Sequence, residues 1–150
     1  MDLSAQLTIL TCLIIATQED WRTQKIPNAL IWPMLAMGLG FNTLYSLHFH
    51  TWTHILSCAA GVSVALAVAV FLAKVKFWGA GDSKLLIACA SFYGLSNSLL
   101  LFIVVTLVAV GITLIIQYIR TRKREWVAQA HCFLIAWAVV FLEPIIKGFF

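Results

Sequence analysis

Long apolar segments occupy most of this chain, and only short polar stretches separate them. Residues 28–47, 55–73 and 99–119 carry no Asp, Glu, Lys or Arg. A helix needs roughly 20 apolar residues to cross the hydrocarbon core of a bilayer, and each of these runs approaches or reaches that length. The pattern therefore predicts helices that span a membrane.

The composition supports this prediction for the whole chain. Hydrophobic residues make up 62% of the sequence, charged residues 11%, and the mean hydropathy is +0.96. Soluble domains are about half apolar and about a quarter charged. The predicted segments are 3–18, 28–47, 55–73, 82–94, 99–119 and 126–142. We expect an all-α membrane protein, a polytopic bundle of about six transmembrane helices that forms one domain over residues 1–150.

The first segment is interpreted as a retained helix. Residues 3–18 have no basic stretch before them and no small-residue cleavage pattern after them, so they do not read as a signal peptide. We therefore expect the chain to be mature as written.

The Lys and Arg residues predict how the bundle is oriented. With six spans, nine of the ten basic residues fall on one side, namely Arg22, Lys25, Lys74, Lys76, Lys84, Arg120, Arg122, Lys123 and Arg124. Short cytoplasmic loops collect such residues, so this side is predicted to be cytoplasmic and both termini to lie outside. The block 120–124 directly follows an apolar span, so we expect it to meet anionic lipid headgroups rather than nucleic acid.

Cysteine and histidine residues do not form a metal-binding pattern. Cys12, Cys58, Cys89 and Cys132 fall in four different apolar segments, with no CxxC pair. We interpret them as small apolar fillers. The three histidines within residues 48–54 are explained by an exposed polar loop. The sequence thus predicts no metal and no cofactor.

The third segment carries small residues that favour close helix packing. Ala59, Ser63 and Ala67 repeat every four residues, with Gly61 and Ala65 beside them. This spacing lets helix backbones approach closely in a membrane.

Two carboxylates stand out among only six acidic residues. Asp20 follows the first apolar segment and Asp82 begins the fourth, so both are predicted at the cytoplasmic level of the membrane. A carboxylate there is costly unless it has a partner or a function. If the two meet, they share a proton, and one can activate water while the other polarises a carbonyl, as peptide hydrolysis requires. The sequence alone does not say whether they face each other.

The residues around Asp82 suit such a site. Gly79 and Gly81 would let a substrate backbone pass close to the acid and would permit positive φ in the turn. The start of a helix would favour the charged form of Asp82, whereas burial would oppose it.

Two motifs surround these acids. They read Asp20-x-Arg22-x-x-x-Ile26-Pro27-Asn28 and Gly79-x-Gly81-Asp82-x-Lys84-Leu85. Together they closely resemble the paired signature of the type IV prepilin peptidases, intramembrane aspartic proteases of the GxGD class. The chain's size is similar to the minimal branch of that family, which is associated with Flp-type tight-adherence pili.

The resemblance implies removal of the leader from prepilins and pilin-like proteins at the cytoplasmic face of a prokaryotic inner membrane. It implies that Asp20 and Asp82 are catalytic and that Gly79 and Gly81 shape the active-site turn. The matching residues Lys84, Pro27 and Asn28 receive no individual role.

Larger members of that family carry a tetracysteine zinc region and also methylate the new N-terminus. This chain lacks those cysteines, so we expect peptidase activity without methyltransferase activity. Residues 129–134 depart from a Pro-Phe segment of larger relatives, so a substrate role for the sixth helix is not carried over.

Other interpretations stay open from the sequence. Asp20 could cap a helix end or pair with Arg22 or Lys25, and Lys84 could pair with Asp82 or anchor the interface. The chain could be a small proton-coupled transporter, because intramembrane acids also build proton relays, or a non-catalytic secretion-system subunit. We expect His131 to be a hydrogen-bonded packing residue. The oligomeric state and the cleaved prepilin are not determined.

Overall fold

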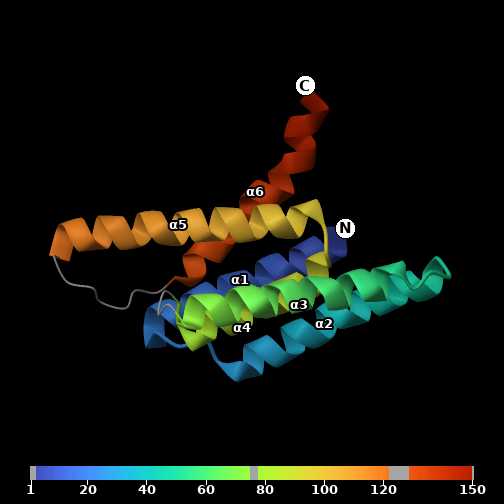
Figure 1. The fold of residues 1–150 in the computed structure, drawn as a ribbon, viewed down its shortest axis with the longest axis horizontal. Coiled ribbons are helices and arrows are strands. Elements are labelled where there is room, and N and C mark those ends of the chain that lie inside the picture. The colour runs from blue at the N-terminus through green and yellow to red at the C-terminus, as the bar shows by residue number, and fades with distance from the viewer. Residues whose placement is uncertain (1–2, 75–77, 122–128, 150) are drawn as a thin grey trace.

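The computed structural model describes residues 3–74, 78–121 and 129–149, and these residues form six helices with no strand among them (Figure 1). The helices are α1 Leu3–Thr23, α2 Asn28–His48, α3 Thr53–Lys74, α4 Ala80–Tyr93, α5 Asn97–Thr121 and α6 Ala130–Phe149. The predicted all-α bundle is confirmed. Lys76 and the basic residues 122–124 lie outside the described residues.

Three of the described helices are long and apolar enough to cross a membrane: α2, α3, and α5 over Asn97–Ile119. Large apolar side chains on their outer faces are exposed, as expected for contact with lipid; Ile112, Ile115 and Ile119 on α5 are examples. The protein is therefore a membrane protein. Helix α4 has 14 residues, which is about 21 Å and too short to cross a hydrocarbon core of about 30 Å alone.

The predicted end of the sixth helix is wrong. The sequence places it at Glu143 and Pro144, but α6 runs on to Phe149. Proline lacks only its own N–H, and helices in membranes tolerate it when the surrounding structure satisfies the freed backbone groups. Figure 1 shows α6 steeply inclined to the other helices.

Helix α4 is the most buried part of the bundle, and it packs against α2 and α3. Glycines allow these approaches. A Cβ on Gly38 of α2 would overlap the Ser91 side chain, and a Cβ on Gly61 of α3 would overlap the backbone of Gly94. Asn42 Nδ2 also donates a hydrogen bond of 2.8 Å to the Ser91 carbonyl.

The packing face of α3 differs from the sequence prediction. Gly61 and Ala65 are buried, as expected of small residues at a helix contact. Ala59, Ser63 and Ala67 are exposed. The third helix carries small residues on more than one side, so four-residue spacing alone does not select the side that packs.

Helix α1 packs mainly against α6, and its buried residues form a stripe that ends in an acid. The stripe consists of Ala5, Ile9, Cys12, Leu13, Ala16 and Asp20. Its spacing of three and four residues follows one helix face. The fold therefore carries Asp20 into the bundle on the same face that buries the apolar residues.

Candidate active site

Asp20 is buried near the end of α1, with 6% of its surface exposed. Its Oδ2 accepts a hydrogen bond of 3.0 Å from the backbone N–H of Ala130. Ala130 is the first residue of α6, where N–H groups have no partner inside the helix. The positive end of the α6 dipole thus faces the Asp20 carboxylate, which stabilises a negative charge there.

Asp82 lies in the first turn of α4, outside the three helices that are long enough to span the membrane. The pKa of the Asp82 carboxyl is raised from 3.8 to about 7, mainly by burial and also by the negative charge of Asp20. Backbone N–H groups at Gly79 and Asp82 act against this shift. Of the two opposing effects expected from the sequence, burial is therefore the stronger.

Both acids line one cavity of about 880 Å³. Its walls are the end of α1, the segment that leads into α2, and the start of α4. The lining residues are Glu19, Asp20, Thr23, Gln24, Lys25, Ile26, Pro27, Asn28, Gly79, Ala80, Gly81, Asp82 and Lys84. The fold therefore brings together every site residue that the sequence singled out.

The expected positive φ in the glycine turn is wrong. Gly79 precedes α4 with φ −75° and ψ 159°, which is ordinary extended backbone, and Gly81 already belongs to the helix. Among the described glycines, positive φ occurs only at Gly94. A Cβ on Gly81 would lie 3.4 Å from the Cβ of Ile26. A side chain as small as alanine would therefore be in ordinary contact with Ile26, which places the start of α4 beside the α1–α2 connection.

The remaining motif residues join α2 to α4. Pro27 has φ −69° and ψ 138° and directly precedes α2, whose first residue is Asn28. Lys84 Nζ donates a hydrogen bond of 2.9 Å to Asn28 Oδ1. Lys84 of the second motif is therefore joined to the first motif through the side-chain amide of Asn28.

Sequence reasoning missed the contribution of α6 to this site. Gln129, just before α6, is buried, and so is Trp78, which stacks on Phe133 with ring centroids 5.4 Å apart. These contacts hold the start of α6 beside Asp20. Position 129 holds none of the usual N-cap residues Ser, Thr, Asp or Asn, so the sequence carries no clear sign of a helix start there.

The surroundings of the cysteines and of His131 indicate packing roles. All four cysteines are buried, free thiols in separate helices, as predicted for small fillers, but Cys58 Sγ also donates a hydrogen bond of 3.1 Å to the Ser91 carbonyl. His131 Nε2 lies 3.5 Å from the Cys132 sulfur, in agreement with a packing role. In the described ranges, no group of three His, Cys, Asp or Glu residues is placed to hold a metal ion.

Comparison with known proteins agrees with the two motifs. Residues 7–116 match the type IV leader peptidase family. The chain is 30% identical over 111 residues to the prepilin leader peptidase/N-methyltransferase of Escherichia coli strain K12, an alignment that covers 73% of this chain and 49% of that protein. The chain thus spans about half the length of this curated relative. No solved structure matches significantly.

Proposed function

Because the chain belongs to the type IV leader peptidase family, we propose that it is an intramembrane aspartic endopeptidase that removes the leader from prepilins and pilin-like proteins. The observation that carries this proposal is the shared cavity. Asp20 and Asp82 come from separate motifs and different helices, yet both line it. Two carboxylates of unequal environment are the groups that peptide hydrolysis by an aspartic mechanism needs.

The two acids take different roles in the proposed mechanism. Asp20, whose Oδ2 accepts a hydrogen bond from the start of α6, is the general base. Asp82, whose pKa is raised to about 7, holds the proton and is the general acid. Asp20 takes a proton from water as the water oxygen attacks the scissile carbonyl carbon, and Asp82 gives its proton to the carbonyl oxygen. When the C–N bond breaks, the proton on Asp20 passes to the leaving amine, and the proton on the former carbonyl oxygen returns to Asp82.

The other residues of the cavity position these acids and the peptide. The Lys84–Asn28 hydrogen bond joins the start of α4 to the start of α2, and Gly81 lies beside Ile26. Lys25 also lines the cavity. Gly79 and Gly81 leave room for an extended peptide backbone beside Asp82.

The membrane arrangement is part of the proposal. The basic residues favour the cavity at the cytoplasmic face of the inner membrane, with both termini outside and the block 120–124 against anionic lipid. The four cysteines belong to four different helices and form no CxxC pair, which favours peptidase activity without methylation.

The transporter alternative is less favoured. Transporter sites usually lie near the bilayer midplane. Here both acids line a cavity formed by helix ends.

The test is leader removal from a co-expressed prepilin, followed by gel mobility and normalised to enzyme level in the membrane. We expect Asp20→Asn and Asp82→Asn each to lower the cleavage rate by at least about a hundredfold, because each removes a proton-transfer group. Glu143→Gln changes an acid of α6 that does not line the cavity and serves as the control. Normal cleavage by both aspartate variants would overturn the proposal.

A further inference from the structure

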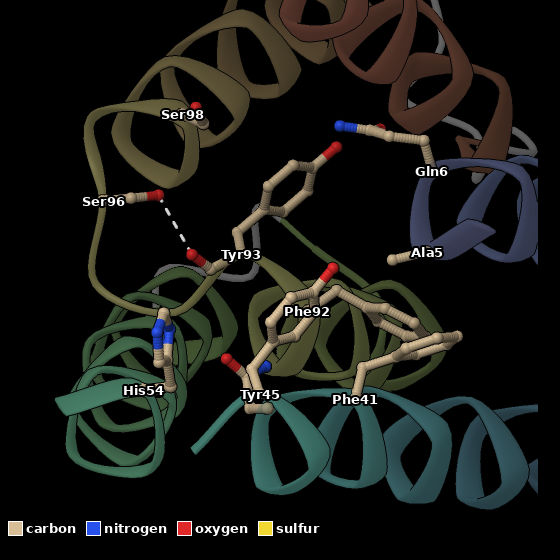
Figure 2. A pocket seen from close by; sticks show the side chains of 10 residues that line it. Ala5, Gln6, Phe41, Tyr45, His54, Phe92, Tyr93, Ser96 and Ser98 are labelled. Carbon is tan, nitrogen blue, oxygen red and sulfur yellow. Dashed lines mark hydrogen bonds between the residues drawn. The ribbon is translucent and has the colours of Figure 1, made fainter. Parts of the chain in front are cut away.

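A second cavity, of about 260 Å³, is lined by the start of α1 and the ends of α2 and α4 (Figure 2). Gln6 belongs to the start of α1, whereas Asp20 is near its end. Tyr45 comes from the last turn of α2, and Tyr93 is the last residue of α4. This cavity is therefore separate from the candidate active site.

Three polar groups of this cavity lack partners. Within the part of the chain that the structure describes, Gln6 Oε1 and the hydroxyl groups of Tyr45 and Tyr93 are buried and make no hydrogen bond. Tyr93 is only 7% exposed. Figure 2 shows the Gln6 side chain and both hydroxyls pointing toward the space between α1 and the ends of α2 and α4. Buried polar groups are nearly always hydrogen-bonded, so three together indicate a bound polar group.

The lining selects the charge of that group. The described residues around the cavity include no Asp, Glu, Lys or Arg, and its three buried atoms without a partner are all oxygens that can accept a hydrogen bond. Aromatic rings surround it instead, from Phe41, Tyr45, Phe92 and Tyr93. Aromatic faces stabilise cations. A primary ammonium has three N–H donors, one for each of the three unpartnered oxygens, whereas a quaternary ammonium has none.

The surroundings select an amphiphile. A groove of about 440 Å³ adjoins the cavity and shares Phe41 and Tyr45 with it. Its other walls include Leu44, which is 65% exposed, and Phe49. Ser98, in the first turn of α5, lines the polar cavity, and its hydroxyl can donate a hydrogen bond to a phosphate. Each part of a phospholipid therefore has a matching surface: the unpartnered oxygens for the headgroup, Ser98 for the phosphate, and the groove for an acyl chain.

We propose that this cavity binds a phospholipid whose headgroup carries a primary ammonium, of the phosphatidylethanolamine class. The ammonium lies among Gln6, Tyr45 and Tyr93, and an acyl chain follows the groove on α2. The lipid would hold together the ends of helices α1, α2, α4 and α5, which all contribute to the cavity.

Native mass spectrometry of the full chain in detergent tests this proposal with phosphatidylethanolamine, phosphatidylcholine and phosphatidylglycerol of identical acyl chains. We expect the wild type to prefer phosphatidylethanolamine by roughly tenfold, and Tyr93→Phe or Gln6→Leu to remove most of that preference, because each takes away one acceptor. Tyr118→Phe is the matched control, since Tyr118 is exposed on α5 and lies outside the cavity.

Two further measurements keep the result interpretable. The lipid-free melting temperature of Tyr93→Phe should equal or exceed that of the wild type, because the lost hydroxyl has no partner. Tyr45→Phe serves as a second variant if that protein unfolds. Equal binding of the three lipids, or an unchanged preference in both tyrosine variants, would overturn the proposal. If equimolar free ethanolamine displaced the lipid, the site would bind a soluble amine rather than a phospholipid, and the proposal would be overturned. Leader cleavage is not a readout, so the outcome is independent of the proposed peptidase.

Discussion

Asp82 should lower the stability of the protein at neutral and higher pH, and Asp82→Asn should remove this effect. The pKa of Asp82 is about 7 in the fold, against 3.8 ordinarily. The folded protein therefore keeps a proton that the unfolded chain loses, so stability falls as the pH rises from about 4 to about 7 and then levels off. At about 1.4 kcal/mol per pH unit, the difference between the two pKa values corresponds to about 4 kcal/mol.

The measurement is thermal unfolding of the detergent-solubilised protein at about pH 5 and about pH 8. An asparagine does not ionise, so we expect Asp82→Asn to exceed the wild type by up to about 4 kcal/mol at the higher pH, or roughly 10 °C in melting temperature. At the lower pH, the difference in unfolding free energy between the wild type and Asp82→Asn should be smaller. Glu19→Gln is the control, because Glu19 lines the same cavity but is only half-buried. Parallel loss of stability in wild type and Asp82→Asn between the two pH values would refute the reasoning.

The charge of Asp20 contributes to the raised pKa of Asp82, and measuring stability over a range of pH can separate this contribution. It raises the pKa of Asp82, so Asp20→Asn should move the upper end of the stability loss to lower pH. An unchanged upper end would mean that the two carboxylates do not interact.

Three other outcomes follow from the packing and the hydrogen bonds. Gly61→Ala should destabilise the fold by about 1–3 kcal/mol in thermal unfolding, because its Cβ would overlap the Gly94 backbone. Gly40→Ala should be neutral or stabilising, since nothing lies within 4 Å of its added Cβ. Lys84→Met and Asn28→Ala should each slow leader cleavage by a few fold, and the double variant should be no slower than the worse single one, because one hydrogen bond joins them; additive losses would contradict this.

The sequence determined the helical membrane character and the residues of the candidate site. Uncharged runs near the length of a bilayer crossing leave the backbone little choice but helix, which is why the spans near residues 28–47, 55–73 and 99–119 match the structure closely. The two motifs likewise marked Asp20 and Asp82, and both line one cavity. The catalytic roles of these acids stay predictions until the variants are measured.

Only the tertiary structure decided which surfaces meet. Helices that are apolar on every side carry no polarity that marks the packed face, so the contact through Gly61, rather than through Ala59 and Ser63, could not be read from spacing. The hydrogen bond from Ala130 to Asp20 joins residues 110 positions apart. Such contacts, and the cavity around Tyr93, depend on how helix ends come together, and no local pattern in the chain records that arrangement.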